Sequence, residues 1–403
     1  MYRFNLSAPG MVFLYGDAMI MSAKTCIATS LDMRTRLSFA SLPPRVVPIE
    51  YIELDFSSIN LHVKIPLTQF LLHFFYHNIK RDVNSIQIYN GVKSFLDSSM
   101  DTYIGTYERS NVDHQSSLQA FFFLLVSVAY KESIEITSSF IVKVSTELTI
   151  GEGLGSSASF AVCLTACFLR WSLLQKGIVR YEFDGDDKLL IASYAIDCDC
   201  IIYQSTSVMA VNVSVKGSIL IFNEGLPIKL FSKDSMFRIK IILVYSNVSM
   251  KTVNLSDIER SVMTNPIAIS ILSIMEALAK ASVQTFIEIN ENIFYLCRGD
   301  IIKPVNLNLP LKLYKKLSEL IQMNQGLLQA LNMSHPEIDI ICAIAQDSSL
   351  AGKLTGKGKG GYAFILLPPN TTDEDITKLI DEFKSHNFPV TLTSLCGNGV
   401  IVE

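Results

Sequence analysis

A glycine-rich segment at residues 151–159 constrains most strongly what this chain can fold into. It reads Gly-Glu-Gly-Leu-Gly-Ser-Ser-Ala-Ser, and an apolar run from Phe160 to Leu169 follows it. Glycines at alternate positions let the backbone turn and expose its N–H groups, because no Cβ blocks the approach of a ligand. The preceding residues, Phe140 to Thr149, alternate with the two-residue period of a strand. The sequence therefore predicts a strand, a glycine loop and a buried helix in succession.

This loop is a candidate phosphate-binding site. A loop that enters a helix N-terminus gathers free N–H donors at the positive end of the helix dipole. The hydroxyls of Ser156 and Ser157 could add a hydrogen bond to a phosphate and a ligand for phosphate-bound Mg²⁺. The alternative is a glycine-rich turn followed by a serine-capped helix. The segment matches neither the P-loop, because no Gly-Lys-Ser/Thr follows, nor the Gly-x-Gly-x-x-Gly pattern.

Composition limits the class of protein. The 403 residues are enough for two domains, and the net charge of −4 without a run of Lys and Arg argues against nucleic-acid binding. The longest apolar run, Ala120 to Ala129, is too short to span a bilayer, so no membrane span is expected. The eight cysteines are scattered and several lie in apolar segments, which indicates reduced core thiols and a cytoplasmic location.

The order of predicted elements indicates two domains, residues 1–224 and 228–403. Short strands fill residues 3–40 of the first. Predicted helices cover residues 67–77, 118–130, 186–204, 256–281 with an interruption near Asn265-Pro266, 285–297, 311–331, 336–347 and 374–386. A second glycine loop, Gly356 to Gly361, carries Lys357 and Lys359 and is either an anion site or an exposed turn.

Three segments together resemble the GHMP kinase family. They are Ser7-Ala-Pro-Gly10, Gly153-Leu-Gly-Ser-Ser-Ala158, and Lys353-Leu-Thr-Gly356 with the further glycines at 358, 360 and 361. Their order and separation fit the family's layout across nearly the whole chain. Residues 28–35 and 157–164 look like the versions found in mevalonate kinases.

The resemblance implies an α+β protein with an N-terminal domain that carries the phosphate loop and a ferredoxin-like C-terminal domain. The last strand could return to the N-terminal domain. It also implies ATP and Mg²⁺ as cofactors, mevalonate or a similar small molecule as acceptor, and a homodimer. The reaction would transfer phosphate from ATP to the 5-hydroxyl of mevalonate in isoprenoid precursor synthesis.

The resemblance assigns candidate site residues one by one. The residues matched to nucleotide binding are Gly153, Gly155, Ser156, Ser157, Lys357 and Gly358. Ser157 and Asp199 match the magnesium positions, with Asp199 standing where the family has a glutamate; a solvated helix carboxylate is its alternative role. Asp17, Lys251 and Thr252 lie roughly where the family binds the acceptor.

The sequence departs from the family where the chemistry is expected. Met11 stands in the position of the lysine that follows Ala-Pro-Gly, and Ala210 falls in the position of the catalytic aspartate. A shift of one residue would place Met209 there instead, but no Asp or Glu occurs from Cys200 through Asn223. No catalytic residue of the family is therefore intact.

Three hypotheses follow from this loss. The first is a mevalonate kinase that works with a rearranged set of residues, with its activity impaired. The second is a nucleotide-binding pseudokinase that acts as a regulatory or dimerisation partner. The third is a GHMP kinase for another small alcohol.

Overall fold

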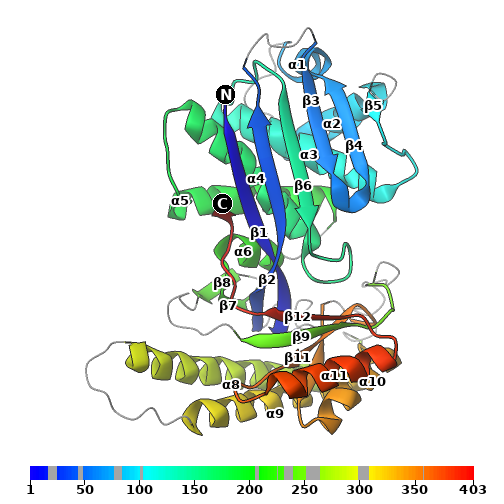
Figure 1. The fold of residues 1–403 in the computed structure, drawn as a ribbon, viewed down its shortest axis with the longest axis vertical. Coiled ribbons are helices and arrows are strands. Elements are labelled where there is room, and N and C mark those ends of the chain that lie inside the picture. The colour runs from blue at the N-terminus through cyan, green and yellow to red at the C-terminus, as the bar shows by residue number, and fades with distance from the viewer. Residues whose placement is uncertain are drawn as a thin grey trace.

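The chain is described from a computed structural model. The described residues are 1–16, 25–43, 49–76, 84–99, 103–204, 208–224, 226–230, 239–250, 264–297, 308–356 and 358–403. Figure 1 shows an upper part built on a large sheet and a lower part built on a smaller one.

The larger sheet has the strand order β13-β1-β2-β6-β3-β4-β5, and β7 and β8 extend it from the lower end of β2. Its strands are β1 (Arg3–Tyr15), β2 (Cys26–Ser41), β3 (Tyr51–Phe56), β4 (Leu61–Pro66), β5 (Ile104–Gly105), β6 (Phe140–Thr146), β7 (Ile219–Asn223), β8 (Leu226–Leu230) and β13 (Ile401–Val402). β3 and β6 pair in parallel, whereas β1 and β2 are antiparallel. In β3 and β4 every second side chain is buried, as expected for a sheet covered on one face.

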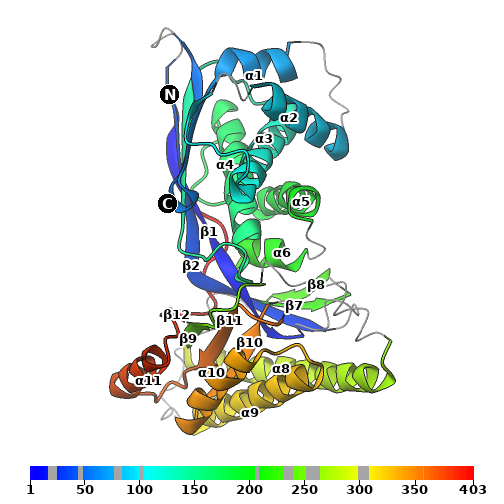
Figure 2. The same cartoon turned by 90° about the vertical axis from the view of Figure 1, so that its right-hand side faces the viewer.

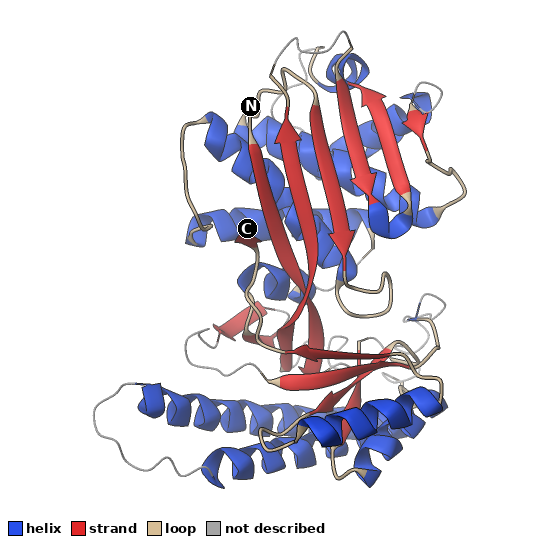
Figure 3. Cartoon of the chain, viewed as in Figure 1, coloured by secondary structure: helices blue, strands red, loops and turns tan. Residues whose placement is uncertain are grey.

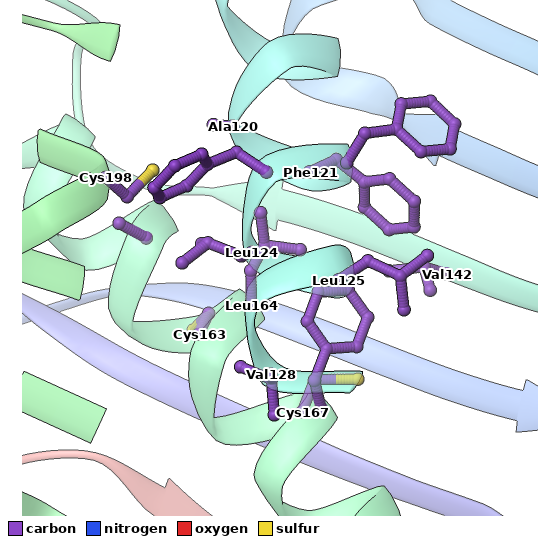
Figure 4. Close-up of a cluster of buried hydrophobic side chains, with 14 of the residues drawn as sticks. Ala120, Phe121, Leu124, Leu125, Val128, Val142, Cys163, Leu164, Cys167 and Cys198 are labelled. Atoms are coloured by element: carbon purple, nitrogen blue, oxygen red, sulfur yellow. The ribbon is translucent and has the colours of Figure 1, made fainter. Parts of the chain in front are cut away.

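Helices cover that one face of the larger sheet, and the other face is open (Figure 2). They are α1 (Leu67–Phe74), α2 (Ser85–Ser99), α3 (Val112–Glu132), α4 (Ser156–Gln175), α5 (Gly185–Ile202) and α6 (Met209–Lys216). α4 is buried on nearly all sides, which is typical of a central helix. Side chains of α3, α4, α5 and β6 meet in the core beside it, among them Leu124, Leu164, Cys198 and Val142 (Figure 4).

The smaller sheet is antiparallel and has the order β10-β11-β9-β12. Its strands are β9 (Lys240–Tyr245), β10 (Ala351–Thr355), β11 (Tyr362–Leu366) and β12 (Val390–Ser394). The helices α8 (Pro266–Cys297), α9 (Asn308–Ala330), α10 (Pro336–Asp347) and α11 (Asp373–Ser385) pack around it (Figure 3). Capping boxes begin α5 at Asp184 and α11 at Thr372, so both starts follow from local sequence.

The two parts are joined by more than a linker. The lower ends of β1 and β2 reach the smaller sheet, and β13, which follows it in the chain, returns to pair with β1. Arg34 of β2 secures this return, because its guanidinium donates hydrogen bonds to the carbonyls of Asn398 and Gly399, each at 2.7 Å. Burial lowers the pKa of Arg34 from its ordinary value, although nearby acidic groups oppose that shift.

The α+β fold class predicted from the sequence is confirmed, while several element boundaries differ from the predictions. α3 starts at Val112, six residues before the predicted helix, and α6 was not predicted. α8 is one helix across the predicted break between 281 and 285. β8 pairs with β7, so the larger sheet continues to Leu230, beyond the predicted end of the first domain at 224. The domain division itself stays a prediction.

Within the described residues, two helices are long and apolar enough to cross a membrane by length and composition: Ser156–Gln175 and the Pro266–Ile289 part of α8. Most of the first window, 83%, is buried inside the protein, against 33% of the second. Length and composition alone are weak evidence, since the core helix of a soluble protein passes the same test.

Candidate functional site

The glycine loop adopts a backbone that favours glycine. Gly151, Gly153 and Gly155 have φ values of +81°, +87° and +74°. Gly155 is the N-cap of α4, and no side chain caps this helix start. The loop is braced locally, because the Gly151 N–H donates to the Ser156 hydroxyl at 3.2 Å. The helix therefore begins with backbone donors that no capping side chain occupies.

The segment Ala8-Pro-Gly-Met11 of β1 lies directly against this loop. The Met11 N–H donates to the Leu154 carbonyl at 2.9 Å, and a Cβ on Gly10 would come within 2.6 Å of the same oxygen. The Ser159 hydroxyl donates to the Ala8 carbonyl at 2.9 Å. The structure thus brings together two of the segments that carry the family resemblance.

A cavity of about 490 Å³ opens beside the N-terminus of α4. This volume is in the range of small-molecule sites. Apolar and aromatic side chains form much of its wall: Phe56, Ile59, Val112, Val144, Ile150, Phe160, Ile202 and Tyr203. Its polar lining comes from Thr35, Ser58, Asp113, Ser116, Ser117, Ser145, Thr146, Gly151, Ser156 and Ser157. The cavity therefore joins an apolar chamber to the candidate phosphate site.

The charge of this cavity is unusual for an anion site. Asp113 is in its lining, and none of the described lining residues is a lysine or arginine. Positive potential there comes from the helix dipole and the N–H groups of the loop. A bound polyphosphate would therefore depend strongly on its own metal ion for charge compensation.

Asp199 lies on α5 and is 2% exposed. It is one helical turn before Tyr203, which lines the cavity. Burial raises the pKa of the Tyr203 phenol well above its ordinary value, and the nearby Cys198, Asp199 and Asp113 add to the shift. The Tyr203 ring is therefore neutral. Asp199 is close enough to Tyr203 to affect its ionisation, but it is not itself in the cavity lining.

The described residues contain no cluster of three His, Cys, Asp or Glu side chains that could hold a metal ion. Mg²⁺ that arrives on a nucleotide needs only one or two protein ligands. Ser157 is in the lining of the cavity, and Asp199 is a buried residue of the neighbouring helix outside that lining. A hydroxyl such as that of Ser157 would suit a nucleotide-borne Mg²⁺, whose chemistry would be to neutralise phosphate charge, whereas the magnesium role of Asp199 stays a prediction.

Met11 and Ala210 lie in one apolar environment. Met11 is 2% exposed and belongs to a cluster that also contains Phe13, Met209 and Val213, against which Ala210 packs. A Cβ on Gly155 would come within 2.8 Å of the Met11 Cγ. The Met11 side chain thus fills the space between the glycine loop and α6 with apolar atoms.

The second glycine loop meets the first. A Cβ placed on Gly153 would lie 3.5 Å from the Gly356 Cα and 2.9 Å from the Met250 Sδ. Gly358 faces elsewhere, because its Cβ would lie 2.9 Å from the Met333 carbonyl oxygen, and it is not in the described cavity lining. Of the predicted site residues, Asp17, Lys251, Thr252 and Lys357 lie outside the described residues.

Sequence reasoning did not single out the aromatic wall of the cavity or the contacts of Glu152. Glu152 is 5% exposed and accepts hydrogen bonds from the Ser249 hydroxyl and the Met250 N–H, at 2.6 and 2.9 Å. One signal was present in the sequence: an acidic residue between two glycines of a loop suited to anions.

Comparisons with known proteins find relatives among the kinases. Residues 308–387 match the family model described as GHMP kinases C terminal. Mevalonate kinase of Homo sapiens is 26% identical over 417 residues, covering 99% of this chain and 94% of the human protein.

Solved structures share the fold. The Methanococcus jannaschii mevalonate kinase matches with a TM-score of 0.68 and 16% identity, covering 98% of this chain and 99% of that one. The L. major mevalonate kinase, solved in complex with R-mevalonate, matches with a TM-score of 0.62 and 12% identity, covering 99% and 94%. The likeness therefore extends over both sheets.

Proposed function

We propose that this chain is a GHMP kinase similar to the mevalonate kinases. It would bind ATP with Mg²⁺ beside α4 and phosphorylate mevalonate at an impaired rate. The reaction would transfer the γ-phosphoryl group to the 5-hydroxyl, a step of isoprenoid precursor synthesis. We place this activity in the cytoplasm, in a protein without a membrane span. We also propose that the protein forms a homodimer.

The single observation that supports nucleotide binding is the cavity that ends at the glycine loop. Its apolar and aromatic chamber suits a nucleobase, and Ser156 and Ser157 lie at the helix start where phosphates would reach. The nucleotide-binding role of Gly153, Gly155, Ser156 and Ser157 is therefore the best-supported part of the proposal. Lys357 and Gly358 remain weaker candidates.

The chemistry of the neighbouring region supports the impaired rate. Phosphoryl transfer relies on positioning and on stabilisation of negative charge. Met11 and Ala210, which stand in the positions of the family's lysine and aspartate, themselves carry neither an ammonium group nor a carboxylate for the acceptor hydroxyl. Acid–base assistance contributes typically about 10²–10⁴-fold, so a kinase without it would still position its substrates but react slowly.

Mevalonate is the proposed acceptor because the L. major relative was solved with R-mevalonate and has the same fold. Asp17, Lys251 and Thr252 are the candidate acceptor contacts. The pseudokinase is the second candidate function, and the burial of Met11 among apolar side chains favours it. A different small alcohol as acceptor is the third.

The test is mevalonate-dependent ADP release at saturating Mg-ATP, with nucleotide binding measured on the same sample. We expect binding, and turnover about 10²–10⁴-fold below the rates of roughly 1–100 s⁻¹ that are ordinary for kinases. A sample without mevalonate corrects for ATP hydrolysis, and a panel of other small alcohols tests the third candidate.

Each other outcome is informative. Turnover at an ordinary rate would mean that other groups replace the missing lysine and aspartate. Binding without any turnover would establish the pseudokinase. No binding of Mg-ATP or Mg-ADP would refute the nucleotide site itself.

A further inference from the structure

Glu152 is a carboxylate in the middle of a loop that is otherwise suited to binding anions. Its negative charge would oppose a phosphate if the side chain faced the cavity. Instead, both carboxylate oxygens are engaged elsewhere: Oε1 accepts from the Ser249 hydroxyl at 2.6 Å and Oε2 from the Met250 N–H at 2.9 Å. Glu152 is absent from the described lining of the cavity. Its carboxylate therefore faces the segment that follows β9.

Further polar contacts support the same junction. The Thr149 and Tyr362 hydroxyls are hydrogen-bonded at 2.6 Å, which links the start of the glycine loop to β11. Tyr245 at the end of β9 also interacts with Glu152. Burial chiefly raises the pKa of the Tyr245 phenol, and the carboxylate of Glu152 adds to that shift. Contacts from β9, β11 and the segment after β9 thus converge on the glycine loop.

These contacts also fix the side chain of Met250. Its Sδ would lie 2.9 Å from a Cβ on Gly153 and 2.6 Å from a Cβ on Gly361. Gly356 would meet the same sulfur atom at 3.4 Å. The thioether therefore lies between the two glycine loops, so close to Gly153 and Gly361 that a Cβ at either position would clash with it. Because the Glu152 carboxylate accepts a hydrogen bond from the Met250 N–H, it also positions the Met250 side chain between the two loops.

We propose that Glu152 is a positioning residue that clamps the glycine loop to the smaller-sheet part of the molecule and so holds the loop's N–H groups ready for nucleotide phosphates. The inference rests on the proposed nucleotide site. It predicts a loop that is ordered before nucleotide arrives, because every contact of the clamp lies within the protein. It also explains why a negatively charged residue is compatible with a phosphate loop. The Glu152 carboxylate accepts hydrogen bonds from Ser249 and Met250 and does not line the cavity.

The experiment compares the full-length protein with Glu152→Ala, Glu152→Gln and Glu319→Ala. Glu319→Ala is the matched control, because it removes an exposed carboxylate of α9. Amide hydrogen exchange of residues 149–156 is measured without nucleotide, and Mg-ADP affinity is measured separately. We expect Glu152→Ala to raise exchange and weaken Mg-ADP binding, each about tenfold. Glu152→Gln should stay close to the original protein, because its amide oxygen can accept from the Met250 N–H and its NH₂ group can donate to the Ser249 hydroxyl.

The possible results test the Glu152 clamp and the proposed nucleotide site separately. Unchanged loop exchange in Glu152→Ala, or tighter Mg-ADP binding, would overturn the clamp, and so would a Glu152→Gln variant that behaves like Glu152→Ala. If the original protein binds no Mg-ADP, the exchange measurement still tests the clamp while the nucleotide site fails. If Glu152→Ala does not fold, Ser249→Ala removes one donor only and should give a smaller rise in loop exchange; no rise would refute the clamp.

Discussion

The side chain of Met11 lies where β1, the glycine loop and α6 meet. It is 2% exposed, and its neighbours Phe13, Met209 and Val213 are apolar. An ammonium group in that place would lose hydration unless a carboxylate or carbonyl accepted its hydrogen bonds. A lysine at this position is therefore tied to an acidic partner, and the residue on the facing helix α6 is Ala210.

This dependence gives a prediction at the residue scale. The double variant Met11→Lys/Ala210→Asp should raise mevalonate-dependent ADP release by about 10²-fold or more, because it restores a charge pair beside the acceptor. Met11→Lys alone should lower the free energy of unfolding by about 1–3 kcal/mol, since it buries a cation without its partner. Steady-state kinetics and urea unfolding of the double and both single variants provide the measurement.

The single variants are the controls for the pair. A double variant that folds as stably as the original protein but shows the same rate would contradict the assignment of these two positions. Met209→Asp with Met11→Lys tests the alignment shifted by one residue.

At the scale of elements, the start of α4 is the most constrained part of the site. Gly155 combines a positive φ with a close contact to Met11, whereas Gly177 after the same helix has a φ of +75° and no atom within 4 Å of a Cβ. A substitution at Gly177 therefore introduces backbone strain alone, whereas one at Gly155 introduces both strain and a steric clash. Strain alone at such a position costs about 1–2 kcal/mol per residue.

Gly155→Ala and Gly177→Ala form a matched pair of variants. Gly177→Ala should lower the free energy of unfolding by about 1 kcal/mol and leave Mg-ADP affinity unchanged. Gly155→Ala should cost more, because the new methyl group must displace Met11, and should weaken Mg-ADP binding about tenfold by shifting the loop. Equal stability losses in the two variants would mean that the contact with Met11 relaxes freely. Urea unfolding and calorimetric titration measure both effects.

The sequence predicted some elements better than others for physical reasons. The strand, glycine loop and helix at 140–175 carried both periodicity and glycine signals, and α10 covers Pro336–Asp347, as predicted. α6 was not predicted because it is only eight residues long and rich in valine, which has no strong helix preference. The clamp of Glu152 was not predicted because its partners lie about 100 residues away in the chain.

At the scale of the whole molecule, burial of thiols links stability to pH. Cys163, Cys167 and Cys198 are each 0% exposed and belong to one core (Figure 4). Burial raises the pKa of Cys163 from 9.0 to about 12, and those of Cys167 and Cys198 well above 9.0. The folded thiols therefore keep their protons at a pH where the unfolded chain loses them.

This difference makes the protein sensitive to alkali. Because the unfolded state binds fewer protons near and above pH 9, the contribution of these thiols to the free energy of unfolding is fully present well below pH 9 and falls as the pH rises toward 12. Each thiol contributes a slope of up to about 1.4 kcal/mol per pH unit. Urea midpoints between pH 8 and 11 measure the fall. Cys167→Ala should make it less steep but not abolish it, because burial also raises the pKa of Cys342 and Cys396 to about 12. A stability that is level up to pH 11 would contradict the prediction.

The overall architecture followed from three motifs in order, and this sufficed for the α+β fold class. The roles of Asp17, Lys251, Thr252 and Lys357 stay predictions, because these residues lie outside the described part of the chain. The pairing of β13 with β1 could be expected only through the family resemblance, since two residues, Ile401 and Val402, carry too little pattern of their own.

That pairing has a consequence for how the protein is made. Leu6 and its partner Val402 lie at opposite ends of the printed sequence, so a ribosome adding roughly 5–20 residues per second leaves the outer edge of β1 without its neighbour for tens of seconds. During that time an open strand edge can pair with another nascent chain. The larger sheet is completed only after the whole smaller sheet has been synthesised. A chaperone that covers β1 during synthesis would therefore protect this protein more than one whose domains are completed one after the other.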